Sequence, residues 1–377
     1  MRLNRYLVVA AGLLAFGSEP ASAQRRWVDS RFPYIKTEAN DFPVFAVRFQ
    51  WTRPAEDYFS PLAYNGNLSL DLGVSPKGTY FATAQFRAPG LKDGWRLAAT
   101  ASAHREARFG FFGIGNDTEF DKDLVTDDQP FFYRMRRKEQ ELQAELTRRI
   151  VSDLYVAGAI GVKHTLLSDL PGPSVFRASF PREVEDTDLT GRISVIYDGR
   201  DNEFNTTRGL FLEAGVSTGT GGEGYRRVYA VAKGFLPIRE GTVIGARIAG
   251  AGMSDDPPLH ARFELPMWER TLIVFGGDDT QRALVKGRFA GKHVLFSNLE
   301  VRHNILDLGT IGALTAMAFV EAGRVFEDER FRLTTDDLKV GGGGGIAIRV
   351  LRSTIFTFNL ASGVEGLNFV VSGGWSF

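Results

Sequence analysis

The sequence predicts an all-β fold, a transmembrane antiparallel β-barrel of sixteen strands. Three observations lead to this prediction. The N-terminus is typical of a secretory signal peptide, and no later stretch holds the ~18 consecutive apolar residues of a membrane-spanning helix. Apolar and polar residues alternate with period two along most of the chain. The last alternating segment, 367–377, ends in an aromatic residue.

The first 23 residues have the three parts of a signal peptide. Arg2 and Arg5 form a positive region, residues 6–16 an apolar run, and Ala21-Ser22-Ala23 a cleavage site. The apolar run is too short to cross a membrane as a helix. We therefore expect residues 1–23 to be removed and the mature chain to begin at Gln24.

The composition excludes some functions and leaves others open. Lys+Arg and Asp+Glu balance at 45 each, so no nucleic-acid partner is indicated, and Cys is 0, so no disulfide forms. The mean hydropathy of −0.12 would also fit a soluble protein. The placement in a membrane therefore depends on the alternation.

The alternation separates an apolar face from a polar one in segment after segment, including 142–147, 154–163 and 189–197. A barrel wall between lipid outside and water inside has this pattern. A soluble β-sandwich also alternates. The dense charge along 136–149 and the glycine run 341–345, which suits a bent wall, favour the barrel.

Fifteen segments read as strands, and a single-chain bacterial barrel has an even number. The sixteenth is expected in 25–37 or in 108–120. We assign 24–41 to a short periplasmic N-terminal segment and 42–377 to the barrel. The fifteen strands are expected at residues 42–52, 64–73, 78–88, 94–107, 131–148, 152–165, 189–199, 208–219, 225–236, 241–252, 294–303, 312–321, 338–350, 354–362 and 367–377.

The strand connections predict the orientation. Residues 200–209 and 237–241 read as periplasmic turns, and the outer loops are expected at 108–130, 166–188, 253–293 and 322–337. The segment 253–293 is unusually long for a loop without secondary structure, and such loops are often functional.

Within and around this loop the chain resembles the BamA/TamA-type bacterial surface antigen superfamily. The matching motifs are Gly276-Gly277, R-A-L-V-K-G-R-F-A-G-K-H at 282–293, N-L-E-V-R at 298–302, Y-D-G-R-D-N-E-F-N-T-T-R-G at 197–209, F-V-E-A-G-R-V-F at 319–326 and F-F-G-I-G-N at 111–116. Ala283 and Leu284 stand where the family has Gly and an aromatic residue.

The resemblance implies a barrel in the outer membrane of a Gram-negative bacterium, without the periplasmic POTRA domains of most members. It implies a role in outer-membrane biogenesis or in transport of protein or lipid, with outer-membrane lipid around the barrel and a separately encoded periplasmic protein as partner. From the alternation, Phe369, Val371, Trp375 and Phe377 share one face of the last strand, and we expect them to form the signal read by the barrel-assembly machinery.

The resemblance also places the long loop inside the lumen with Arg282 at its tip. A buried cation needs an acidic partner. Glu300 is the nearest candidate, because Leu299 and Val301 take the apolar face of their strand. Glu321 is the second, although Met317 and Phe319 share its parity. In a wet lumen such a latch would be worth ~1–3 kcal/mol.

Other functions remain as alternatives. A passive pore is one. A lipid hydrolase is another, because Gly215–Gly219 fits G-x-S-x-G and would need Ser217 beside His104 or His164. No helix follows that motif, so the sequence indicates no enzyme. The five histidines have no metal-ligand spacing, and neither a metal nor a cofactor is predicted.

Overall fold

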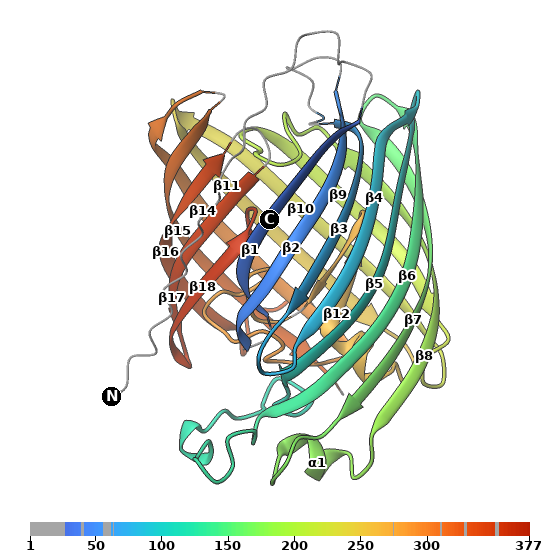
Figure 1. The fold of residues 1–377 in the computed structure, drawn as a ribbon, viewed down its shortest axis with the longest axis vertical. Helices are drawn as coiled ribbons and strands as arrows, with labels where there is room; N and C mark the ends of the chain where they lie inside the picture. The colour runs from blue at the N-terminus through green and yellow to red at the C-terminus, as the bar shows by residue number, and fades with distance from the viewer. Residues whose placement is uncertain are drawn as a thin grey trace.

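The computed structural model describes residues 27–38, 41–55, 62, 64–273, 275–309, 311–327, 330–350 and 354–377. Sixteen strands form one antiparallel sheet that curls into a barrel (Figure 1). They are β1 (Val28–Glu38), β2 (Asp41–Pro54), β3 (Tyr64–Val74), β4 (Tyr80–Lys92), β5 (Trp95–Gly110), β6 (Arg134–Val151), β7 (Leu154–Ser168), β8 (Val184–Asp198), β9 (Gly209–Gly219), β10 (Tyr225–Arg239), β11 (Thr242–Met253), β14 (His293–Asp307), β15 (Gly312–Phe326), β16 (Lys339–Val350), β17 (Thr354–Gly363) and β18 (Gly366–Gly373).

The predicted fold class and the number of barrel strands are confirmed. Each strand pairs with its neighbours in sequence, except that β11 pairs with β14. Between these two the chain forms a separate hairpin, β12 (Glu264–Met267) and β13 (Arg270–Ile273). The sequence pattern predicted only a loop there.

The sixteenth strand is β1, so one of the two candidate segments, 25–37, is essentially right. The assignment of 24–41 to a periplasmic segment is wrong for Val28–Glu38, which pairs with β2 along its length. The reason it escaped prediction is its outward face. That face carries Asp29 and Arg31, so it lacks the apolar stripe of the other strands. The signal peptide lies outside the described residues.

The four longest connections all leave the same end of the barrel, the lower end in Figure 1. They join β5 to β6, β7 to β8, β11 to β14 and β15 to β16. They contain a short helix, α1 (Val175–Ser179), and two 3-10 helices, η1 (Lys122–Leu124) and η2 (Leu259–Phe263). No helix among the described residues is long and apolar enough to cross a membrane. By the rule that outer loops are the long ones, this end faces the cell exterior.

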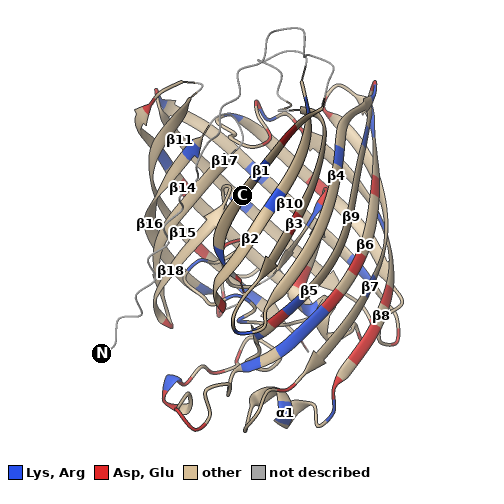
Figure 2. Cartoon of the chain, viewed as in Figure 1, with Lys and Arg blue, Asp and Glu red and all other residues tan. Residues whose placement is uncertain are grey.

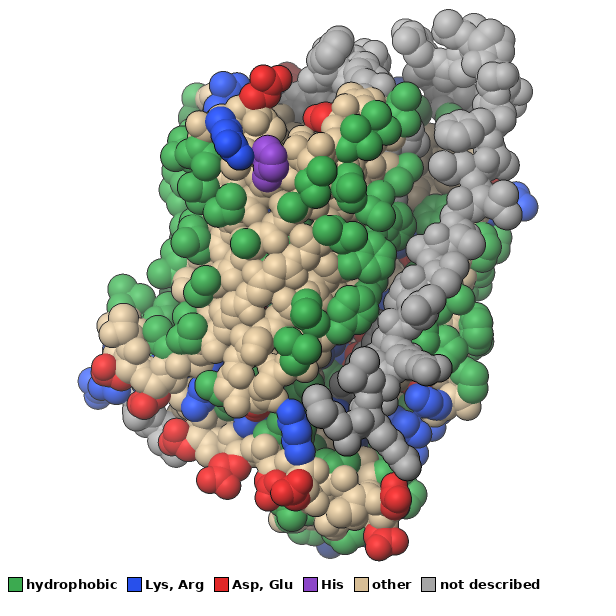
Figure 3. Space-filling view, turned by 90° about the vertical axis from the view of Figure 1, so that its left-hand side faces the viewer, with side chains coloured by type: hydrophobic (Ala, Val, Ile, Leu, Met, Phe, Trp, Pro, Cys, Tyr) green, Lys and Arg blue, Asp and Glu red, His purple; other side chains and the backbone are tan. Residues whose placement is uncertain are grey.

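The outer surface of the wall is apolar around the middle of the strands. In Figure 3, apolar side chains are spread over the middle of the face among backbone and other uncharged groups, and most charged side chains lie toward its two ends. On β6, for example, Leu142 and Leu146 are exposed while Gln143 and Glu145 face inward. This is the arrangement that the period-two pattern predicts for a wall in lipid.

The inside of the barrel is packed. The largest buried cluster joins wall residues such as Phe211, Tyr229 and Phe296 to loop residues such as Trp268 and Leu284. Residues 254–273 and 275–292 contact strands on opposite sides of the barrel, such as β6, β7 and β15, and therefore lie within the lumen, as predicted. The lumen of the sixteen-stranded barrel is therefore largely filled.

The sheet has two edges, β1 and β18. No pairing joins these strands within the part of the chain that the structure describes. The barrel thus has a seam where backbone groups of two neighbouring edge strands lack strand partners.

Candidate functional site

The tip of the lumen loop is a tight turn built on two glycines. Gly276 and Gly277 have φ values of 112° and 89°, which side-chain-bearing residues rarely adopt. A Cβ on Gly276 would collide with the Val285 carbonyl. The Gly277 amide lies 3.0 Å from the carbonyl oxygens of both Gln281 and Leu284. This turn fixes the direction in which Arg282 projects.

Arg282 is almost completely buried, at 2% exposure, and it meets two carboxylates. Its Nη1 lies 2.7 Å from Oε2 of Glu300, and its Nη2 lies 2.8 Å from Oε1 of Glu321. Glu321 also accepts hydrogen bonds from the backbone amide of Arg282 at 2.6 Å and from its Nε at 2.9 Å. Both predicted partners are thus in place, and Glu321 makes more contacts than Glu300.

Further groups complete the shell around this latch. The guanidinium carbon lies 3.4 Å from the ring centroid of Phe319. Arg302 donates to Glu300 at 2.6 Å, and Asn298 donates to Glu321 at 2.9 Å. The mixed parity around Glu321 has a simple cause. Met317 and Phe319 face the lumen because they pack around the Arg282 side chain.

The same loop tip reaches both edge strands of the sheet. Asn368 of β18 donates to the carbonyl oxygen of Arg282 at 2.8 Å. Lys286 lies 3.1 Å from a carboxylate oxygen of Glu38 on β1. Residues 282–286 therefore link the two strands that do not pair with each other.

The glycine run of β16 makes room for this tip. A Cβ on Gly341 would collide with the methyl group of Ala283, and a Cβ on Gly363 of β17 would lie 3.0 Å from it. The run was interpreted from sequence as a site of wall curvature. Its contact with the loop gives it a packing role as well.

The hairpin β12–β13 extends toward the periplasmic end. At its turn, Trp268 donates through Nε1 to Thr147 at 3.0 Å and through its backbone amide to Glu213 at 2.9 Å. The Arg96 guanidinium lies 4.4 Å from the indole ring. These contacts fasten the hairpin turn to β5, β6 and β9.

Next to Trp268, four charged groups meet. Glu269 of the hairpin and Glu203 of the periplasmic β8–β9 turn share Arg87 and Arg96. Arg96 lies 2.5 Å from Glu203 and 3.2 Å from Glu269. Burial alone would raise the pKa of Glu203, but the charges of Arg96, Arg87 and Arg200 outweigh it and lower that pKa below its usual value. The periplasmic turn is thereby tied to the lumen hairpin.

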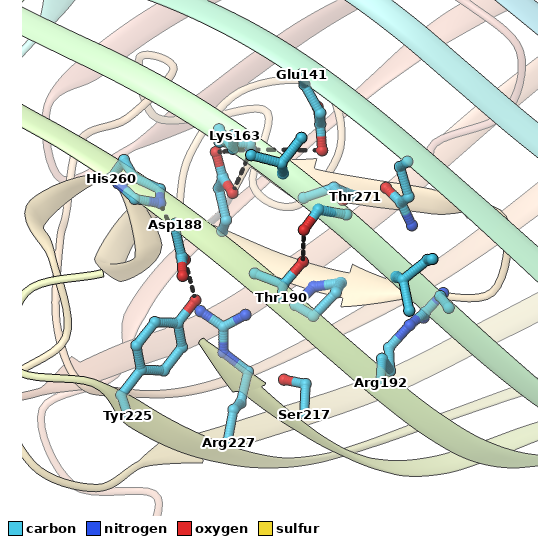
Figure 4. A pocket seen from close by; sticks show the side chains of 17 residues that line it. Glu141, Lys163, Asp188, Thr190, Arg192, Ser217, Tyr225, Arg227, His260 and Thr271 are labelled. Carbon is cyan, nitrogen blue, oxygen red and sulfur yellow. Dashed lines mark hydrogen bonds and ion pairs between the residues drawn. The ribbon is translucent and has the colours of Figure 1, made fainter. Parts of the chain in front are cut away.

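Closer to the outer end, the loop borders a small cavity of about 60 Å³ (Figure 4). Lys163 of β7 lies 2.7 Å from Glu264 of the loop. His260 of the loop lies 3.4 Å from Asp188 of β8, which also accepts a hydrogen bond from Tyr225 at 2.7 Å. These polar pairs join the loop to the wall in a third region of the lumen, besides the Arg282 latch and the contacts of Trp268.

The C-terminal residues do not continue β18. The strand ends at Gly373, and Gly374, with φ 92°, turns the chain into the lumen. Trp375 donates to Asn205 at 3.0 Å, and the backbone oxygen of Phe377 accepts from Arg302 at 3.3 Å. The prediction that Trp375 and Phe377 share a face of one strand with Phe369 and Val371 is therefore wrong. The cause is a single positive-φ glycine.

Comparison with known proteins decides the family. The profile of the Omp85 superfamily domain matches residues 64–361, most of the chain. This chain belongs to the Omp85 superfamily. A search of curated protein sequences finds no significant match to this Omp85 protein. The match to the Omp85 superfamily domain confirms the expected resemblance to the BamA/TamA-type family. It also confirms that the protein is located in the outer membrane of a Gram-negative bacterium.

Solved structures show the same fold for this Omp85 barrel. BamA from Haemophilus ducreyi lacking POTRA domains 1–3 aligns with a TM-score of 0.57 at 12% identity, over 88% of this chain and 67% of that one. CdiB from Escherichia coli aligns with a TM-score of 0.57 at 12% identity, over 91% of this chain and 61% of that one. CdiB from Acinetobacter baumannii aligns with a TM-score of 0.50 at 12% identity, over 92% of this chain and 58% of that one. This chain thus spans about two thirds or less of each.

The residues of the hydrolase alternative do not come together in this Omp85 barrel. Ser217 faces inward on β9, whereas His164 is on β7 with a side chain 41% exposed beside Glu185. His104, on β5, contacts Thr83. Among the described residues, no cluster of three or more His, Cys, Asp and Glu side chains could hold a metal ion.

The sequence did not reveal the second charged cluster, which consists of Arg87, Arg96, Glu203 and Glu269. Its members lie in four separate segments, and no spacing links them. The only signal was the inward parity of Arg87 and Arg96 on adjacent strands, where two cations without an acid would be costly.

Proposed function

We propose that this Omp85 barrel acts in outer-membrane biogenesis by admitting a client polypeptide at the seam between β1 and β18. The observation that carries the proposal is the loop tip 282–286, which contacts both edge strands through Asn368 and Glu38. An exposed strand edge can pair with an extended polypeptide. Release of the tip would free both edges together.

The filled lumen argues against the passive pore as the main function. Sixteen strands enclose enough space for an aqueous channel. Here the space holds a hairpin, a loop tip and residues 374–377. A pore function would require all three to leave.

We propose that client capture in the periplasm depends on a second, separately encoded protein. The β8–β9 turn is the candidate contact, because Glu203 within it reaches the lumen hairpin. A partner bound to this turn would act on the loop through Arg87 and Arg96.

The test is assembly of a urea-unfolded outer-membrane barrel into proteoliposomes that hold the purified protein. We expect faster appearance of heat-modifiable, protease-resistant client than in protein-free liposomes. The chain has no cysteine, so Ala283→Cys with Gly363→Cys can lock the tip to the wall. The lock should stop assembly under oxidation and restore it after reduction, and each single variant should stay active. Equal rates with and without the protein would refute the proposal.

A further inference from the structure

The outward faces of β5 and β6 show where the lipid bilayer ends. Trp95 lies opposite Arg148 near the periplasmic end, and Arg105 lies opposite Lys138 toward the outer end. Both pairs of positions are ten residues apart (105 − 95 and 148 − 138). Ten residues span about 34 Å along a strand, or roughly 24–28 Å across the membrane at a tilt of 35–45°.

Between these limits the outward side chains of β5 are all apolar. They are Leu97, Ala99, Ala101 and Ala103. On β6, Gln140 lies opposite Ala103 at the outer side of the band, and Leu142, Ala144 and Leu146 cover the rest of it. The band matches the ~25 Å height of an outer-membrane apolar belt. Arg105 and Lys138 therefore lie at the boundary between the acyl chains and the outer headgroups.

Three cations gather at this boundary. Arg105 and Lys138 face each other across neighbouring strands, and Arg136 follows on the same face of β6, two residues closer to the exterior. Figure 2 shows the basic residues at the lower end of β6. Tyr80 lies opposite Arg105 on β4. Directly opposed side chains in an antiparallel sheet have Cβ atoms about 5 Å apart, so the group is compact.

None of the three cations has an ion pair within the described part of the chain. Arg105 donates through Nη1 to the Gly78 carbonyl at 2.6 Å, which holds its guanidinium in place. The Nε of Arg136 is buried and has no hydrogen-bond partner. The outward carboxylate in register with Lys138 two strands away is Glu185 on β8, which lies 3.5 Å from His164. Like charges that face each other destabilise a sheet, so an external anion would offset a real cost.

We propose that Arg105, Arg136 and Lys138 bind a phosphate group of the glycolipid that forms the outer leaflet. The planar guanidinium matches phosphate in a two-point contact, and the lysine adds a point charge. The site faces lipid, at the depth of the headgroups, so the ligand is a membrane lipid.

The test measures binding of bisphosphorylated lipid A to the detergent-purified full chain by native mass spectrometry. Each cation near an anionic surface is worth about a fivefold change in Kd, so Arg136→Gln with Lys138→Gln should weaken binding roughly 25-fold. Lys138→Arg should keep it. Arg226→Gln is the matched control, because Arg226 is an outward, lone cation at the same rim, opposite Thr218 on β9.

Two further probes identify the ligand group. Dephosphorylated lipid A should bind about as weakly as the double variant does. Inorganic phosphate at the same concentration should leave lipid binding unchanged. Unchanged affinity in the double variant, or full competition by inorganic phosphate, would overturn the proposal. Heat modifiability of each variant confirms that its barrel is folded.

Discussion

At the scale of single residues, the latch is more tightly enclosed than the sequence suggests. Arg282, Glu300 and Glu321 are 2%, 1% and 1% exposed, so water screens them little. The estimate for a wet lumen therefore understates the cost of breaking the pair. Removal of one partner of a buried ion pair costs roughly 3–5 kcal/mol, mostly because a buried charge remains unpaired.

We predict that Arg282→Ala and Glu321→Gln each lower the unfolding free energy by about 3 kcal/mol, and that the double variant is little worse than either single variant. The reason is that each substitution removes the same contact, between Arg282 and Glu321. Unfolding is followed by heat modifiability over a urea series. Glu300→Gln should cost at least as much, since it removes a carboxylate from both Arg282 and Arg302. Additive losses would show that Arg282 and Glu321 do not interact.

A second residue-scale prediction concerns Asp278 at the loop tip. Burial, with the neighbouring charge of Asp279, raises its pKa from 3.8 to about 6. The folded state thus holds this proton up to a higher pH than the unfolded state. Its contribution to stability is complete below about pH 4 and is lost as the pH rises through 6.

We therefore expect hydrogen exchange in residues 276–289 to be slower at pH 5 than at pH 7.5, after correction for intrinsic rates. The difference should be at most about 3 kcal/mol. Asp278→Asn should remove most of this pH dependence and match the wild type at low pH. A variant with an unchanged pH profile would assign the effect to another group.

At the scale of elements, the hairpin β12–β13 is one of the parts that fill the lumen. Its turn is held by Trp268, by Glu269 and, from the periplasmic side, by Glu203. A hairpin this short is not stable alone in water. Its position therefore depends on the wall contacts, and loss of these should release it.

We predict that Trp268→Ala lowers the unfolding free energy by about 3–5 kcal/mol and frees the hairpin. The substitution removes a large buried ring together with its contacts to two aromatic neighbours, Tyr155 and Phe211. The readout is single-channel conductance in planar bilayers, which should rise as the plug loosens. Glu203→Gln should raise conductance less, because Glu269 still pairs with Arg87 and Arg96. Closed channels in both variants would show that the hairpin does not block the lumen.

At the scale of the whole molecule, the seam and residues 374–377 distinguish this barrel from a simple closed wall. Phe377 packs against Phe235, and Arg247 lies 5.0 Å from its ring centroid. A residue expected to face lipid is thus part of the lumen packing. The proposed assembly signal can be divided accordingly between β18 and the last four residues.

We predict that deletion of Phe377 lowers the amount of assembled barrel in cells several-fold, because Arg302 and Arg247 lose a packing partner and the assembly machinery loses a terminal aromatic. Heat-modifiable protein in outer-membrane fractions is the measure. Phe369→Ala tests the lipid-facing half of the signal separately. Undiminished assembly in both would reject the C-terminal signal.

The sequence by itself determined the class of fold, and the resemblance of its loop motifs placed Arg282 in the lumen. Period-two alternation is a local property, since each strand must present one face to lipid and the other to the lumen. It therefore revealed fifteen of the sixteen strands. It failed at Val28–Glu38, whose outward face carries Asp29 and Arg31.

Only the tertiary structure decided how the lumen is filled. The partners of Glu269, the link from the loop tip to Glu38 and Asn368, and the inward turn at Gly374 join residues far apart in the chain. No local pattern encodes such contacts, because they depend on which inward faces meet across the closed sheet. The grouping of Arg105 with Lys138 has the same origin. Strand register, set by the whole wall, places the two cations side by side.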